Sequence, residues 1–245
     1  MRLLAVLYGA AAYAVFLASF LYAIAFVGDF GVPKTINSGA PGPLIEALVI
    51  NALLLGVFAV QHSLMARPAF KRWWTRFVPE PVERSTYVLF SSLALILLYW
   101  QWRPVPEVVW LIDDPLGRQV VWGIFGLGWL TVLTSTFLIN HFDLFGLRQV
   151  WAYRRQQEIP PAEFKTPLFY RVCRHPIYLG FIVAFWAAPT MSQGRLGFAL
   201  ATTAYILIAI QLEERDLISH FGATYADYKR RVGMLIPWPK AGGGS

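Results

Sequence analysis

Long apolar stretches alternate along this chain with short joints that are charged or rich in glycine and proline. A helix needs about 20 apolar residues to cross the hydrocarbon of a bilayer. Candidate stretches occupy residues 3–27, 44–66, 86–102, 119–140, 170–190 and 196–214. The fifth is the least clear, and the short link 191–195 leaves open a re-entrant hairpin in place of two crossings. The pattern predicts an all-α, polytopic membrane helix bundle with five to six transmembrane helices.

These stretches are expected to form one integral-membrane domain over residues 1–240. The first stretch is longer than the roughly 7 to 15 apolar residues of a signal peptide, which favours a retained membrane helix. The final run AGGGS, residues 241–245, is typical of an artificial linker remnant.

Composition supports the membrane assignment. The chain of 245 residues is 57% hydrophobic and 14% charged, against about 45–50% and about 25% in ordinary soluble domains. Its net charge of +7 would suit nucleic acid, but no RNP, zinc-finger or helix-turn-helix pattern accompanies it. The single cysteine, Cys173, excludes an internal disulfide framework. We expect a lipid bilayer and no nucleic acid as partner, and the oligomeric state stays open.

The basic residues fall mostly on one side of the predicted bundle. With the N-terminus placed inside, only four of the 21 Lys and Arg residues fall outside: Lys34, Arg103, Arg118 and Arg195. Cytoplasmic loops of membrane proteins carry such an excess. The distribution therefore predicts that both termini are cytoplasmic and that the number of spans is even.

Candidate chemistry lies on the same side. The segment RVCRHPIYLGF (171–181) places Arg174 and His175 directly before Pro176, a residue suited to the first turn of a helix. The N-terminus of that helix would favour an anion such as a carboxylate. The alternative is that Arg174 and His175 are only interfacial anchors.

The tail extends this polar region. Glu213 and Glu214 end the sixth stretch, where an unpaired carboxylate would be unfavourable. Beyond them four residues form one aromatic and apolar stripe at helical spacing: Phe221, Tyr225, Tyr228 and Val232. This stripe predicts a cytoplasmic amphipathic C-terminal helix, with Lys229, Arg230 and Arg231 on its lipid-headgroup face.

The motif RHPIYLG (174–180), followed by EERDLISHFGATYADYKRRV (213–232) and IP (236–237), resembles the C-terminal signature of the isoprenylcysteine carboxyl methyltransferase superfamily. These integral-membrane enzymes use S-adenosylmethionine. The resemblance implies a cofactor site mostly within residues 170–239, lined by Arg174, His175, Tyr178, Glu213, Glu214 and Tyr225. Membrane sterol reductases shelter NADPH in a related way, so an NADPH-linked reductase is an alternative.

Two upstream segments indicate which branch of this superfamily the chain resembles. NHFDLFGLRQVW (140–151) and QHSLMARPAFKRWW (61–74) look like the bacterial branch that methylates methanethiol to dimethyl sulfide. This likeness implies an enzyme of the bacterial inner membrane, with its active site on the cytoplasmic side and a small thiol as substrate. Another thiol, an isoprenylcysteine carboxylate, and a non-catalytic role related to denitrification remain alternatives.

Methylation of a thiol requires removal of its proton, because an alkyl thiol is mostly protonated near neutral pH. Histidine suits this task, since it is largely neutral at pH 7. We expect His141 to act as the base, with Asp143 as its orienter or as an alternative base. Four further residues are expected around the substrate: Asn140, Phe142, Arg148 and His62. The alternative is that Asn140, His141 and Asp143 only cap a helix. No metal is expected, because no HExxH or similar ligand spacing occurs.

Overall fold

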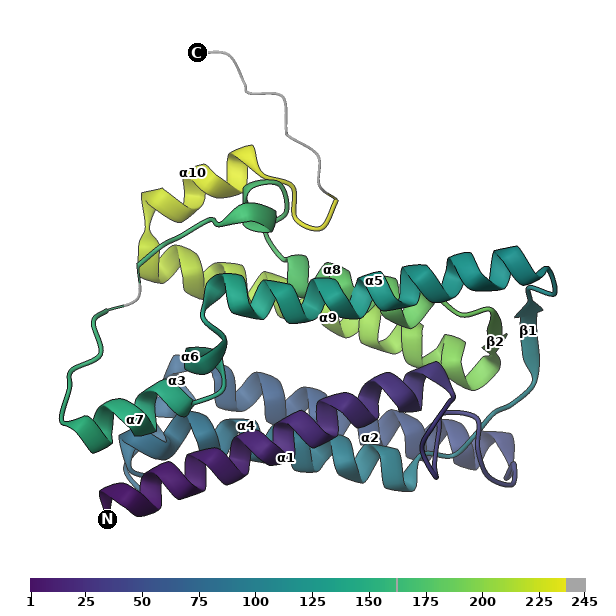
Figure 1. Ribbon diagram of the computed structural model, residues 1–245, viewed down its shortest axis with the longest axis horizontal. Helices are drawn as coiled ribbons and strands as arrows, with labels where there is room; N and C mark the ends of the chain where they lie inside the picture. The colour runs from purple at the N-terminus through teal and green to yellow at the C-terminus, as the bar shows by residue number, and fades with distance from the viewer. Residues whose placement is uncertain (162, 237–245) are drawn as a thin grey trace. The chain divides into compact units, whose positions relative to one another are not determined.

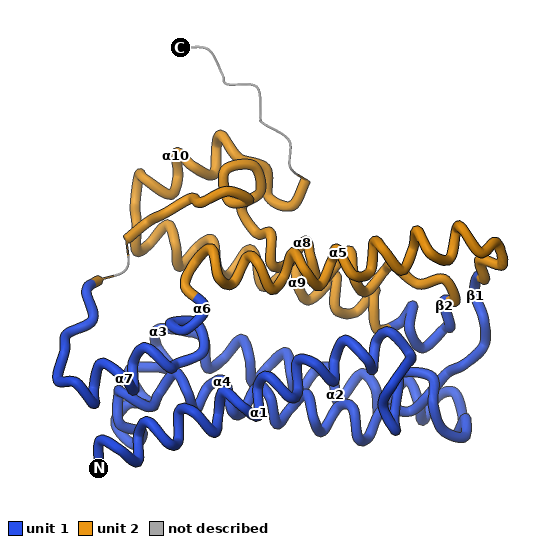
Figure 2. The backbone as a smooth tube through the Cα atoms, in the orientation of Figure 1, with its two compact units in different colours: residues 1–110, 141–160, 191–197 blue, residues 111–140, 161–190, 198–245 orange. Residues whose placement is uncertain are grey.

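The computed structural model describes residues 1–161 and 163–236, so the expected linker remnant at 241–245 lies outside the described residues. The chain divides into two compact units (Figure 2). Unit 1 comprises residues 1–110, 141–160 and 191–197, and unit 2 comprises residues 111–140, 161–190 and 198–245.

Five helices in the described part of the chain are long and apolar enough to cross a membrane (Figure 1): α1 (Arg2–Gly28), α2 (Leu44–Ala66), α4 (Glu80–Gln101), α5 (Pro115–Ile139) and α9 (Gln193–Phe221). Many of their large apolar side chains point outward; Leu4 is 67% exposed and Leu53 is 64% exposed. Such surfaces are unfavourable in water but suit contact with lipid chains. The prediction of a polytopic helical membrane protein is confirmed.

Unit 1 is built on α4, which packs against both α1 and α2. Three short helices accompany them: α3 (Pro68–Trp74), α6 (His141–Leu144) and α7 (Leu147–Arg155). The Arg2 guanidinium lies 6.0 Å from the ring centre of Tyr153. The Arg84 Nε donates a hydrogen bond to the Leu144 carbonyl at 2.8 Å. The N-terminus and the basic residues around α3 and α7 therefore share one end of unit 1, which is how the charge distribution grouped them.

Unit 2 contains a shorter apolar segment that runs beside α5. Its α8 (Pro176–Trp186) has 11 residues, about 16 Å of helix, which is half of the roughly 30 Å hydrocarbon core. The flanking residues nevertheless reach both ends of α5. The Tyr170 hydroxyl donates to the Ser135 carbonyl at 3.4 Å, and the Ile112 N–H donates to the Pro189 carbonyl at 2.9 Å. Residues 170–189 thus run along α5 in the opposite direction.

The second half of this segment, after α8, is not helical. Pro189 cannot extend a helix, because proline lacks an N–H group, and β2 (Thr190–Ser192) pairs with β1 (Val108–Leu111) in a two-stranded sheet. Non-helical backbone is tolerated at membrane depth only where protein covers it. Ala188 and Met191 are indeed at most 2% exposed. The fifth predicted stretch therefore follows the predicted path, but as a half-length helix continued by a buried extended segment.

Two glycines allow α5 and α8 to approach closely. A Cβ atom at Gly128 would lie 2.7 Å from the Ala184 nitrogen, and one at Gly180 would lie 2.7 Å from the Gly128 carbonyl oxygen. Small residues at helix contacts are the usual means of tight packing between membrane helices. The contact fixes α8, whose first turn carries the RHP motif.

We expect Gly128→Val to destabilise unit 2, because the added side chain must force the two helices apart, at a cost of about 1–3 kcal/mol. Gly126→Val is the matched control on the same helix, since a Cβ at Gly126 meets nothing within 4 Å. Thermal unfolding of both variants in detergent checks this expectation. Equal midpoints for the two variants would contradict the assigned contact.

Candidate active site

The first turn of α8 is held in place by the C-terminal tail. The Arg174 N–H donates to the Gly233 carbonyl at 2.9 Å, and the His175 N–H donates to the Met234 carbonyl at 3.2 Å. Pro176 is the first residue of α8, as predicted. The tail pairs with the RHP motif like a short strand, so residues almost 60 positions apart are fixed side by side.

Cys173 anchors the same junction. It forms a parallel β-bridge with Gly233, and its Sγ donates to the Leu235 carbonyl at 3.4 Å. The residue is only 2% exposed. Cys173 is therefore a buried packing residue.

The carboxylate of Glu214 lies at the centre of a buried cluster of polar side chains. Its Oε1 accepts from the Arg174 Nε at 2.6 Å and lies 3.2 Å from the His175 Nε2. Its Oε2 lies 2.7 Å from the Lys229 Nζ. The Tyr225 hydroxyl donates to Oε1 at 3.5 Å. Glu214 is 1% exposed, so these partners replace the water that a carboxylate otherwise requires.

Lys229 was expected on the lipid-headgroup face, and its side chain is 40% exposed, but its ammonium group pairs with the buried Glu214. Lys229 follows Tyr225 by four residues on α10 (Ala223–Arg231), and side chains four apart share a helix face. Its ammonium group is thereby directed to Glu214. Arg230 fits the expected exposed position, where it pairs with Asp227. The sequence signal that could have identified Lys229 is the requirement of a buried glutamate for nearby cations.

Two members of the predicted aromatic stripe, Tyr225 and Tyr228, lie on the buried face of α10, while Phe221 ends α9 and Val232 follows α10. Tyr225, Tyr228 and Val232 form one core cluster, against which Phe164 and Phe221 pack. The Tyr228 hydroxyl also donates to the Tyr170 carbonyl at 2.5 Å. Burial raises the pKa of the Tyr225 and Tyr228 hydroxyls, so both stay protonated as hydrogen-bond donors.

The two glutamates differ in exposure. Glu213 has a side chain that is 42% exposed, and its Oε2 lies 3.9 Å from the His175 Nδ1. The ring of Tyr178 lies 5.6 Å from that of His175. Unit 2 therefore brings together all six predicted cofactor residues: Arg174, His175, Tyr178, Glu213, Glu214 and Tyr225.

His141 belongs to unit 1. Asn140 follows the last turn of α5, where its N–H donates to the Thr136 carbonyl, and the chain then forms α6. The His141 Nε2 lies 2.8 Å from the Tyr13 hydroxyl of α1. The imidazole is 4% exposed, and burial lowers its pKa below the ordinary value. His141 is therefore neutral at pH 7 and able to accept a proton.

His141 directly follows the end of α5, which is where the sequence placed it, and it contacts Tyr13 of α1. Tyr13 is 11 residues beyond Arg2 in α1, which corresponds to about 16 Å along the helix from its basic end. We expected His141 at the mouth of the fourth span. Tyr13 itself was missed, because a hydrogen bond across 128 positions leaves no local sequence signal.

Asp143 and Arg148 hold the turn between α6 and α7. The Asp143 Oδ1 accepts from the Gln149 Nε2 at 2.9 Å, and Oδ2 lies 3.5 Å from an Arg148 guanidinium nitrogen. Gly146 in this turn has a φ of 86°, and a Cβ there would lie 2.5 Å from the Ser85 Oγ. The turn thus depends on glycine for both its backbone conformation and its approach to α4.

His62 lies between α2 and α4 in unit 1. Its Nδ1 lies 3.2 Å from the Ser91 Oγ and 3.0 Å from the Tyr87 hydroxyl. Tyr87 belongs to a core cluster against which Phe16 and Phe145 pack. Phe145 in turn contacts His141, with 4.8 Å between ring centres. His62 and His141 therefore border the same aromatic core, while Phe142, 53% exposed, lies at its edge.

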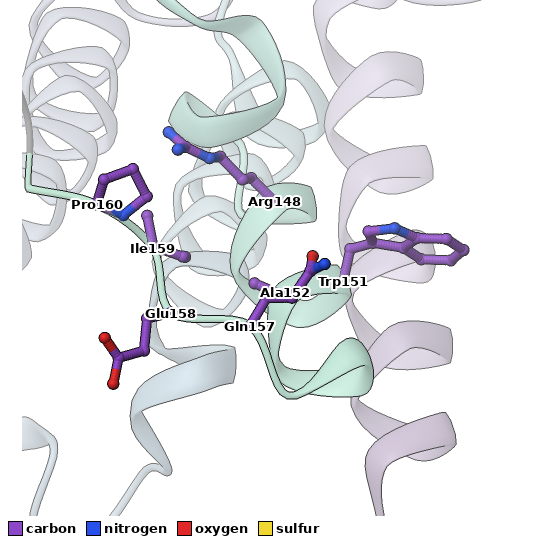
Figure 3. Close-up of a pocket in the computed structure, with 7 residues that line it drawn as sticks. All are labelled: Arg148, Trp151, Ala152, Gln157, Glu158, Ile159 and Pro160. Atoms are coloured by element: carbon purple, nitrogen blue, oxygen red, sulfur yellow. The ribbon is translucent and has the colours of Figure 1, made fainter.

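A pocket of about 540 Å³ lies beside α7, between that helix and the segment 157–160 (Figure 3). Arg148, Trp151 and Ala152 line its helical side. Among the described residues, Arg148 is the predicted site residue that lines this pocket. The pocket is thus a feature of α7 rather than of the cluster around Glu214.

Comparison with known proteins shows the family. Methanethiol S-methyltransferase of Mycobacterium tuberculosis is 58% identical over 238 residues, which are 97% of this chain and 98% of that protein. Methanethiol S-methyltransferase 1 of Bradyrhizobium diazoefficiens is 57% identical over 98% of this chain and 84% of that protein. The chain belongs to the methanethiol S-methyltransferase family.

A more distant relative, Nurim of Mus musculus, is 32% identical over 71% of this chain and 69% of its own length. No family model matches the chain, and no solved structure matches it. Membership of the methanethiol S-methyltransferase family confirms the expected methyltransferase class and favours it over the reductase and the non-catalytic alternatives.

We expect Glu214→Gln to destabilise unit 2 by about 3–5 kcal/mol, because the buried Arg174 and its neighbours lose the charge that compensates theirs. Glu213→Gln is the matched control one residue away, where the side chain is 42% exposed. Thermal unfolding in detergent separates the two. A Glu214→Gln protein as stable as the Glu213→Gln protein would contradict the role given to Glu214.

Proposed function

We propose that this protein transfers the methyl group of S-adenosylmethionine to the sulfur of methanethiol and so produces dimethyl sulfide. Family membership carries the reaction class and the thiol substrate. The cluster around Glu214 supports the identity of the methyl donor, because its donor set suits an amino-acid-like cofactor that bears a carboxylate and a ribose diol.

The residues of unit 2 fit such a cofactor. His175 is the N-terminal cap of α8 and, within the described chain, makes no side-chain capping bond there. The first turn of α8 is thus a place where a carboxylate can accept backbone N–H groups. Glu213, half-exposed beside His175, is suited to accept hydrogen bonds from ribose hydroxyls. We assign Glu214 to hold Arg174, His175 and Lys229 in position. Both of its carboxylate oxygens already have partners within the protein.

When bound, S-adenosylmethionine supplies a sulfonium-activated methyl group. The protein has to remove the thiol proton, so that the sulfur lone pair forms the new C–S bond as the old one breaks. His141 is the group we assign to receive this proton, since its burial keeps it neutral. Asp143 and Arg148 fix the turn that carries it. Asn140, Phe142 and His62 are assigned to the surroundings of the thiol, in an aromatic setting that suits a small apolar molecule.

We place the protein in the bacterial inner membrane, with both termini and the active site on the cytoplasmic side. The concentration of basic residues at one end of unit 1 supports this orientation. The course of residues 170–189 along α5 supports it as well, because five long helices plus one interrupted crossing make an even number. Each of the two units is built from three separate ranges of the chain, so that neither unit is one continuous segment. This supports our assignment of residues 1–240 to a single domain.

The purified protein in detergent is expected to form dimethyl sulfide from methanethiol only when S-adenosylmethionine is added. Gas chromatography of the headspace measures the product, and NADPH in place of the methyl donor is the control. Absence of the product from folded protein would overturn the proposed reaction.

Glu213→Gln is expected to weaken binding of S-adenosylhomocysteine about 10- to 100-fold, since a charged hydrogen-bond acceptor contributes about 1.5–3 kcal/mol. Isothermal titration calorimetry measures the affinity. Arg230→Ala, which changes an exposed residue of α10 paired with Asp227, is the control and should bind like the parent. If the Glu213→Gln protein bound S-adenosylhomocysteine with the parental affinity, the assignment of Glu213 to the cofactor site would be wrong.

A further inference from the structure

His141 is the assigned proton acceptor, yet little of it is accessible. It is 4% exposed, and aromatic rings surround it: Tyr13, Phe142 and Phe145 lie between 4.8 and 5.7 Å from its ring centre. Its Nε2 is also engaged, 2.8 Å from the Tyr13 hydroxyl. A thiol that gave its proton directly to this nitrogen would have to displace Tyr13.

Tyr13 is the more accessible member of the pair. It is half-buried, whereas His141 is buried, and its ring packs at 5.9 Å from Phe16 and 6.2 Å from Phe145. A phenolic hydroxyl can accept one hydrogen bond while it donates another. Tyr13 can therefore receive a proton from a thiol on one side and pass its own proton to the His141 Nε2 on the other.

We propose that Tyr13 relays the thiol proton to His141 and is thus a further catalytic residue of the methyl transfer. This inference rests on the proposed function. In the step, the S–H bond breaks and a new O–H bond forms on Tyr13, while the former O–H bond breaks and an N–H bond forms at His141 Nε2. Tyr13 stays neutral, His141 becomes an imidazolium, and the thiol is left as the thiolate that methyl transfer requires.

Other ionisable groups near α6 make interactions with partners other than His141, so Tyr13 is the group placed to pass a proton to it. Arg84 of α4 donates to the Leu144 carbonyl and stacks on Tyr87, which bonds His62. On α6 and α7, the Asp143 carboxylate accepts from Gln149 and pairs with Arg148. From α1, Tyr8 lies 3.0 Å from the Thr86 Oγ1, a partner that does not titrate.

Tyr13→Phe tests the relay, because it removes the hydroxyl but keeps the ring that packs on Phe16 and Phe145. We expect kcat for methanethiol to fall about 100-fold or more at pH 7, with unchanged affinity for S-adenosylhomocysteine. The loss should shrink as the pH rises, since the thiol then ionises in solution without help. Tyr8→Phe is the matched control on the same helix and should keep the parental rate and pH profile.

Two further measurements separate catalysis from packing. A more acidic thiol such as trifluoroethanethiol should be methylated by the Tyr13→Phe protein at close to the parental rate. The losses in kcat caused by His141→Ala and Tyr13→Phe should not add in the double variant, because both substitutions interrupt the same proton path. A constant fold-loss at every pH, or full activity of Tyr13→Phe at pH 7, would overturn the relay. An inactive parent would instead overturn the proposed function, so the two failures are distinguishable.

Discussion

The carboxylate of Glu214 holds three separate segments of unit 2 together. It receives Arg174 and His175 from the start of α8 and Lys229 from α10, while it is itself part of α9. A fully buried charge is tolerated only when its partners satisfy it completely. The extended tail depends on the same group, since an Arg174 guanidinium nitrogen also donates to the Val232 carbonyl at 2.5 Å. This ionic cluster therefore fixes Arg174, His175 and Lys229 next to one another.

The features that the sequence predicted well were local ones. Pro176 marked the start of α8, and the spacing of Tyr225, Tyr228 and Val232 marked the buried face of α10. Hydropathy located the long helices, because lipid-facing leucines need no partner elsewhere in the chain. The count of basic residues grouped α3, α7 and the N-terminus at one end of unit 1.

The features that the sequence did not predict all depend on distant partners. Lys229 and Arg230 are neighbouring basic residues in the sequence, but Lys229 pairs with Glu214 whereas Arg230 pairs with Asp227. Tyr13 looked like any tyrosine of an apolar helix until α6 was placed beside it. The extended backbone after α8 was not predicted either, because it is seen only in the pairing of β2 with β1, a distant segment of the chain. The sequence thus located most of the candidate residues, and tertiary contacts show which of them lie together.

The burial of Cys173 has a meaning specific to thiol chemistry. A protein that presents a reactive methyl donor to a small thiol also presents it to any thiol of its own, and free thiols in turn exchange with disulfides derived from the substrate. The chain has one cysteine, which is 2% exposed, and its Sγ donates to the Leu235 carbonyl of the tail. Burial thereby covers the one thiol of the chain, which lies directly next to the residues that we assign to the methyl donor.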